Sequence, residues 1–194
     1  MHQFRLIWLL AFVTLVGCAA APLEDRAAVD RLEVDELRHA ILGLGDGIDP
    51  EEAERAAQIA YSYSLLLARE YRVTDPPLIH NAKVHLGLRE RGLCYHWAAD
   101  LEARLLQEEF RTLETHRAIA PETLRRIEHS TAVISRRGDR LFDGVILDPW
   151  RGGGRLHWAK VGDDTDYDWR PEAEVLDARV RSREARANLS TMSP

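Results

Sequence analysis

The sequence predicts an α+β fold in which N-terminal helices pack on a C-terminal antiparallel sheet. Apolar residues recur at helical spacing before residue 110, and capping residues and glycines divide this stretch into separate helices. After Phe110 the pattern changes to short strand-like runs, which glycine-containing turns separate. Helices that precede all the strands favour an α+β domain with an antiparallel sheet.

The first residues resemble a lipoprotein export signal. An apolar run follows Arg5, and it has the length of a signal-peptide core but is too short to span a bilayer. Leu15-Val16-Gly17-Cys18 then resembles the lipobox of bacterial lipoproteins, whose cysteine is acylated. We therefore expect the chain to be exported and lipid-anchored to the membrane through Cys18. The alternative is an ordinary signal peptide followed by a chance cysteine. Because Ala19 follows, the resemblance implies the outer membrane, facing the periplasm.

Length and charge suggest one domain after this signal. We expect a signal peptide at residues 1–17, a tether at 18–25, a single domain at 26–176 and an arginine-rich tail at 177–194. The tail looks like a frayed helix or an extended end. The formal net charge of the whole chain is −6, which gives no support for a nucleic-acid partner.

The helical part contains several start and stop signals. The stretch up to Leu44 is helical in composition. Asp49 before Pro50 is a favourable N-cap, and it predicts a helix that runs to about Tyr71. A third helix is predicted over Ile79–Arg91, ended by Gly92, and a fourth over Cys94–Phe110. Its buried row is expected to contain Trp97, Leu101 and Leu105.

Four strands are predicted, at residues 115–120, 129–135, 142–148 and 156–161. Gly138-Asp139 lies between the second and third, and it is a favourable two-residue hairpin loop. Such a loop fixes the register, because residues directly opposite each other then point to one face. The predicted pairs are His129 with Asp148, Thr131 with Ile146, Val133 with Gly144, and Ser135 with Phe142.

Cys94 is the candidate nucleophile. The chain has two cysteines, and lipidation of Cys18 leaves Cys94 without an intramolecular partner, which is unusual in an exported protein. Cys94 lies at a predicted helix N-terminus, where unpaired N–H groups and the helix dipole stabilise a thiolate and can donate to an oxyanion. The alternative is a small buried hydrophobic residue. A histidine held by a carboxylate on adjacent strands would complete a Cys-His-Asp arrangement.

Three short segments together resemble the transglutaminase-like branch of the papain-like cysteine enzymes: Gly92-Leu93-Cys94-Tyr95-His96-Trp97, Glu128-His129-Ser130 and Ile146-Leu147-Asp148-Pro149-Trp150. The resemblance covers about Gly92 to Trp158. It implies Cys94 as nucleophile, His129 as general base and acid, and Asp148 as the residue that orients the ring. The implied activity is acyl transfer at amide bonds, as in peptidases, amidases and transglutaminases. The branch also includes inactive members, and no side-chain oxyanion donor is identified here.

Other interpretations remain open. His96 is a rival candidate for the base. It lies two residues after Cys94 on a helix, however, so its side chain should point away from the thiol. His80, His85 and His157 lack metal-ligand spacing, so we expect no metal and no cofactor. A non-catalytic envelope module that uses the same fold for binding, and a structural lipoprotein with Cys94 in its core, are the alternative functions. For an enzyme, the anchor makes an envelope peptide or protein the reachable substrate.

Overall fold

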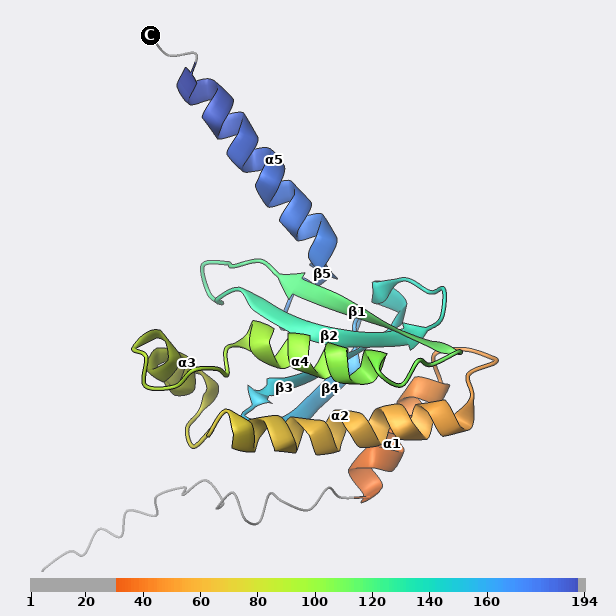
Figure 1. Cartoon of the computed structure of the whole chain (residues 1–194). Helices are drawn as coiled ribbons and strands as arrows, with labels where there is room; N and C mark the ends of the chain where they lie inside the picture. Colours follow the sequence, from red (N-terminus) through yellow and green to blue (C-terminus); the bar gives the residue numbers. More distant parts are fainter. Residues whose placement is uncertain (1–30, 192–194) are drawn as a thin grey trace, which may run out of the picture.

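The computed structural model describes residues 31–191 and confirms the α+β prediction. Its helices and a five-stranded antiparallel sheet form the body of the molecule, and the sheet order is β4-β3-β2-β1-β5 (Figure 1). The signal peptide and Cys18 lie outside the described residues. The helices are α1 (Arg31–Leu42), α2 (Pro50–Glu70), α3 (Pro77–His85), α4 (Cys94–Leu106) and α5 (Glu172–Thr191), with a 3-10 turn η1 (Leu141–Asp143). The strands are β1 (Leu113–Ala120), β2 (His129–Arg136), β3 (Val145–Gly152), β4 (Arg155–Lys160) and β5 (Arg170–Pro171).

Helix starts were predicted better than helix ends. Asp49 caps α2 as expected, since its side chain accepts a hydrogen bond from the Glu51 N–H at 2.8 Å. The third helix is shorter than predicted, because the chain leaves the helix after His85 and turns through Gly87 at a positive φ. The fourth begins at Cys94 as predicted but ends at Leu106, four residues before Phe110.

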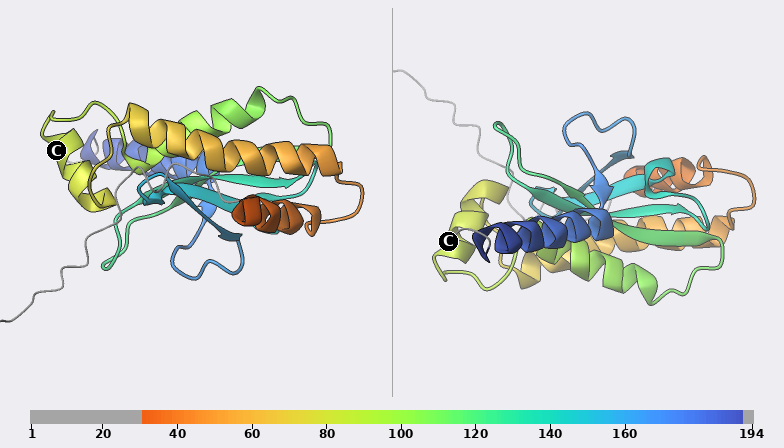
Figure 2. Two further views of the ribbon diagram at one scale, coloured as in Figure 1. Left: turned by 90° about the horizontal axis from the view of Figure 1, so that it is seen from below. Right: turned by 90° about the horizontal axis from the view of Figure 1, so that it is seen from above.

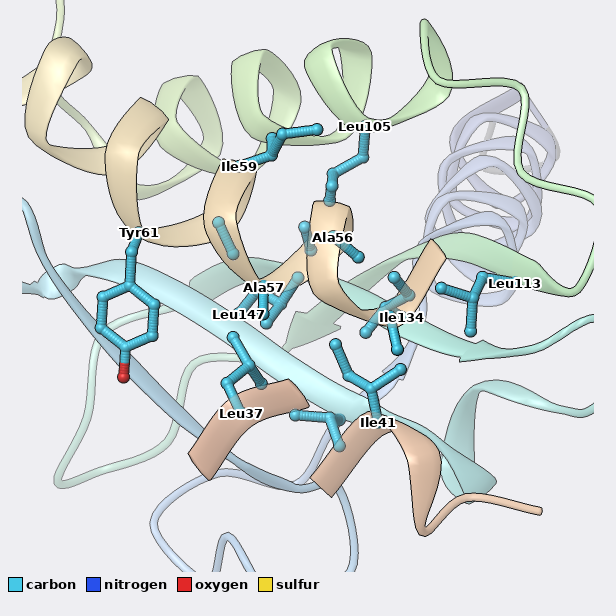
Figure 3. Packing of buried hydrophobic residues seen from close by; sticks show 14 of the residues in the cluster. Leu37, Ile41, Ala56, Ala57, Ile59, Tyr61, Leu105, Leu113, Ile134 and Leu147 are labelled. Atoms are coloured by element: carbon cyan, nitrogen blue, oxygen red, sulfur yellow. The ribbon is translucent and has the colours of Figure 1, made fainter. Parts of the chain in front are cut away.

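The main core lies between the sheet and the helices α1, α2 and α4. Figure 3 shows Leu37 and Ile41 of α1 and Ala56 of α2 gathered over Ile134 and Leu147 of the sheet. All five side chains are buried, so this layer removes a large apolar surface from water. Small alanines on α2 let that helix lie close to the strands.

A second, smaller core lies on the other face of the sheet. It contains Val133 of β2, Ile146 of β3 and Trp169 from the connection between β4 and β5. Alternate residues of a strand point to opposite faces, so His129 shares a face with Val133, and Asp148 shares it with Ile146. The register therefore brings the predicted histidine and acid to the same side.

The predicted hairpin register is wrong. Val133 pairs with Ile146 instead of Gly144, because residues 137–144 form a longer connection that includes η1. The error is two residues, and a shift of two keeps every side chain on its predicted face. His129 and Asp148 are consequently diagonal neighbours instead of directly opposed, still within reach of each other.

No sequence pattern indicates β5, and α5 extends well into the predicted tail. β5 has only two residues and pairs with β1 at the edge of the sheet. In Figure 1, α5 projects away from the sheet, and in the view from above in Figure 2 it lies in front of the body of the molecule. Within residues 31–191, no helix is long and apolar enough to cross a membrane.

Candidate active site

The loop before α4 is held in place by buried hydrogen bonds. Gly92 has φ +119°, and a Cβ there would lie 2.2 Å from the ring nitrogen Nε2 of His80. That nitrogen makes a 2.9 Å hydrogen bond with the carbonyl of Arg91, and the Trp97 indole donates to the carbonyl of Gly92 at 2.9 Å. Glycine is therefore required at this position. The loop delivers Cys94 to a fixed place as the first residue of the helix.

His96 caps the helix that carries Cys94. Its Nδ1 lies 3.2 Å from the N–H groups of Gly92 and of Leu93, and it accepts from both. Burial, followed by the charge of Arg91, lowers the pKa of His96, which favours the neutral ring needed for accepting. His96 therefore has a structural task, in keeping with the prediction that it does not serve as the base.

Cys94 is partly exposed at the tip of α4. Its Sγ lies 3.9 Å from the carbonyl oxygen of Glu128, the residue immediately before β2. The first hydrogen bonds inside the helix run from His96 and Trp97 to the Leu93 carbonyl. The N–H groups of Cys94 and Tyr95 consequently have no partner within the helix. The thiol thus lies beside the start of β2, where free amide groups could receive a developing negative charge.

His129 and Asp148 form a buried hydrogen-bonded pair. His129 Nε2 lies 2.5 Å from Asp148 Oδ2, and the two side chains are 0% and 1% exposed. Unpaired ionisable groups are rarely buried so completely, because burial penalises a charge without a partner. The predicted meeting of this histidine and this acid is present in the structure.

Three aromatic rings surround the His129 imidazole. The centroids of Trp150 and Tyr167 lie 4.7 Å from it, and that of Trp169 lies 5.4 Å away. The Trp150 indole also donates to Oδ1 of Asn81 at 3.1 Å, which ties this wall to α3. The rings exclude water from the histidine, and low polarity strengthens its interaction with the acid.

The electrostatics favour a protonated His129. Burial lowers the pKa of His129, but the charge and hydrogen bond of Asp148, followed by the proximity of Cys94, outweigh it and raise the value to about 9. His129 Nδ1 is buried and has no hydrogen-bond partner within the described residues. Since Nε2 is engaged by Asp148, Nδ1 is the nitrogen free to exchange a proton with the neighbouring thiol. The arrangement can hold an imidazolium beside a thiolate.

No sequence pattern indicates the second pair of charged residues, Arg151 and Asp164, that lies next to Asp148. Arg151 Nε donates to Asp148 Oδ2 at 2.7 Å, and the same guanidinium pairs with Asp164. Asp164 also accepts a 2.8 Å hydrogen bond from the Trp169 indole. Burial raises the pKa of Asp164, but the hydrogen bonds from Arg151 and Trp169 outweigh it and lower the value overall.

Strand alternation would have placed Arg151 on the wrong face. Three residues after Asp148, a regular strand would point it away from the acid. The pairing of β3 with β4 is irregular between Asp148 and Gly152, and this change of register brings Arg151 back to the acid. Pro149 was the one local signal of irregularity, because proline cannot donate to a sheet hydrogen bond.

Within residues 31–191, no group of three or more His, Cys, Asp or Glu side chains is placed to hold a metal ion. His80 lies under the loop before α4, while His157 lies beside Arg151 at 3.1 Å. These histidines therefore act as hydrogen-bonding partners in separate parts of the molecule. The site itself presents a thiol, an imidazole and a carboxylate as its reactive groups.

Comparisons of the chain with protein-family models, with curated proteins and with solved structures found no match. The function must therefore be inferred from the geometry of Cys94, His129 and Asp148.

Proposed function

We propose that this protein is a thiol enzyme that acts on amide bonds by acyl transfer, with Cys94 as nucleophile, His129 as acid and base, and Asp148 as the orienting acid. One observation carries the proposal: a fully buried histidine–aspartate pair lies beside a partly exposed thiol at a helix N-terminus. A cysteine followed along the chain by a histidine and an acid on adjacent antiparallel strands also supports a transglutaminase-like, papain-like fold.

The first half of the reaction forms a thioester. The Cys94 thiolate attacks the amide carbonyl carbon, and the carbonyl oxygen takes up negative charge. The N–H groups of Cys94 and Tyr95, which lack partners in the helix, are placed to stabilise it. The C–N bond then breaks, and protonated His129 gives its proton to the leaving amine. Asp148 keeps the ring oriented while its charge changes.

The second half releases the acyl group. His129, now neutral, removes a proton from water as the water oxygen attacks the thioester. The C–S bond breaks, so that a carboxylic acid leaves and the thiolate–imidazolium pair is restored. An amine in place of water would give transamidation instead. We propose hydrolysis as the main reaction, because water is the acceptor present at highest concentration.

We further propose that the protein works in the cell envelope, anchored by acylated Cys18 in the outer membrane and facing the periplasm. The support is the lipobox-like sequence at residues 15–18. Two or more acyl chains anchor a protein stably where one does not. Peptides of the cell wall and envelope proteins are then the amides within reach. Cys18→Ala should abolish lipid labelling and release the protein from the membrane fraction, and unchanged lipidation would contradict this location.

The enzyme proposal can be tested without knowing the substrate. Unlipidated protein carrying Cys18→Ala, which leaves Cys94 as its only thiol, is mixed with an activated ester and followed by intact mass. An acyl adduct on Cys94 that forms rapidly and then disappears is expected, and Cys94→Ser should form none. Incubation with cell-wall peptides and envelope proteins should then produce new termini that the Cys94→Ser protein does not produce.

The same experiment distinguishes the alternative functions. Rapid reaction of Cys94 with a small reagent, without turnover of any amide, would favour a non-catalytic binding module. Slow reaction until the protein is denatured would instead identify Cys94 as a core residue of a structural lipoprotein.

A further inference from the structure

Arg151 shares one oxygen of Asp148 with the histidine. Arg151 Nε donates to Asp148 Oδ2 at 2.7 Å, and His129 Nε2 meets that same oxygen at 2.5 Å. The backbone N–H of Arg151 donates to the other oxygen, Oδ1, at 3.3 Å. One buried carboxylate therefore accepts hydrogen bonds from two groups that can carry positive charge and from one amide.

The guanidinium is itself held from its far side. Its two terminal nitrogens pair with the two carboxylate oxygens of Asp164. Its carbon lies 4.6 Å from the centroid of the Tyr167 ring, and this ring in turn packs against His129. The Arg151 side chain is 14% exposed. These contacts restrict the orientation of the guanidinium, whereas an arginine in a surface ion pair keeps most of its side-chain mobility.

We propose that Arg151 is a positioning residue for the Cys94 site: it holds the Asp148 carboxylate aimed at His129, and Asp164 holds Arg151 in place to do so. This inference rests on the proposed function, because the position of the acid matters only if the ring and the thiol share a proton.

The physical reason is the cost of a buried charge. Burial opposes the ionised form of a carboxylate, and hydrogen bonds to that form offset the penalty. Without the Arg151 side chain, the Asp148 carboxylate loses the donor that fixes its direction, and it can turn its charge away from the ring. The charge that stabilises the imidazolium would then be lost, and the thiolate would lose its counter-ion. Because Asp164 balances the charge of Arg151, the guanidinium repels the imidazolium only weakly.

Charged and titratable groups face this assembly from every neighbouring element. They are Cys94 of α4, Arg126 before β2, His129 of β2, Asp148 and Arg151 of β3, His157 of β4, and Asp164, Asp166 and Tyr167 of the β4–β5 connection.

The test compares Arg151→Gln with the charge-balanced double variant Arg151→Gln, Asp164→Asn. The double variant leaves neither partner buried alone, so it keeps the test possible if the single variant does not fold. The control removes an exposed pair of the same kind, Arg140→Gln with Asp143→Asn, whose members are 79% and 47% exposed. All variants carry Cys18→Ala, and each is alkylated with iodoacetamide between about pH 5 and 10.

Both Arg151 variants should react about tenfold more slowly than the parent near pH 6.5, with the midpoint of the pH profile displaced upward by about one unit. The control should follow the parent. A folded variant with the parent's profile would overturn the inference, as would an equal loss of rate at every pH. Recovery of the parent's pH profile by the double variant would also overturn the inference. The slower reaction of Arg151→Gln would then be explained by the uncompensated negative charge of Asp164. A parent that itself reacts like an ordinary thiol would instead refute the proposed function.

Discussion

Replacing Asp148 with Asn tests the electrostatics of the site while preserving its shape. The pKa of His129 rises from the ordinary 6.5 to about 9. This difference corresponds to about 3 kcal/mol, or about 300-fold in the proton affinity of the ring. Asp148 is the largest of the favourable causes, and an asparagine can accept the same hydrogen bond but brings no charge. In the variant, burial should dominate and the ring should lose its proton at neutral pH.

The expected result is a large loss of thiol reactivity at low pH. In a Cys18→Ala background, Asp148→Asn should slow iodoacetamide alkylation of Cys94 by about 10- to 100-fold near pH 6.5. The difference should disappear near pH 10, where an ordinary thiol is also ionised. Intact mass against time gives the rates, and Asp143→Asn, at an exposed loop carboxylate, is the control. Coinciding pH profiles for Asp148→Asn and the parent would show that the Cys94 thiolate does not depend on the histidine–acid pair.

Three further predictions concern stability, each measured by urea unfolding. The raised pKa of His129 stabilises the fold fully below about pH 6.5, and this contribution, about 3 kcal/mol in all, is lost as the pH rises toward 9. Cys94→Ser removes the part of the pKa shift that Cys94 supplies, so this variant should lose less than the full 3 kcal/mol across that range, namely the part due to Asp148. A flat dependence would contradict it. Gly92→Ala should destabilise by more than about 2 kcal/mol, because its Cβ would collide with a buried ring. Gly47 also has a positive φ, but a Cβ added there would meet no atom within 4 Å. Gly47→Ala should therefore lower the free energy of unfolding by less than Gly92→Ala, and equal losses would exclude a collision with the His80 ring as the cause. The Glu52 side chain is 3% exposed and accepts hydrogen bonds from two backbone N–H groups. Glu52→Gln should therefore lower the free energy of unfolding by about 1 to 3 kcal/mol, and a decrease below about 0.5 kcal/mol would contradict this.

The α+β class and the contact between His129 and Asp148 could be predicted because they depend on local patterns. Asp49 before Pro50 marks a helix start by its capping chemistry, and the structure confirms it. The two-residue alternation of strands placed His129 and Asp148 on one face, and this survived a register error because the error was an even number of residues.

The register itself depends on a longer connection. Gly138-Asp139 is a favourable turn, and Gly138 does adopt φ +87°. The chain nevertheless continues through η1 before β3 begins at Val145. Leu141 is buried under the sheet, so tertiary packing favours the longer path over the tightest hairpin.

The second layer of the site could not be read from the sequence, because it depends on irregular backbone. Arg151 reaches Asp148 through an irregularity in strand pairing, and Asp164, Tyr167 and Trp169 come from a loop without periodicity. β5 is too short to give a strand pattern. Positions of this kind follow from long-range packing, which local propensity does not encode.

The charge of the Cys94 sulfur in the resting protein tests the proposed site most directly. A thiolate absorbs in the far ultraviolet where a thiol does not, so the difference spectrum between the Cys18→Ala protein and its Cys94→Ser derivative reports the thiolate alone. We predict that the thiolate band is present near pH 6.5 and that His129→Ala removes it at that pH. A band that appears only near pH 8.5, as for a free cysteine, and is unaffected by His129→Ala would contradict it.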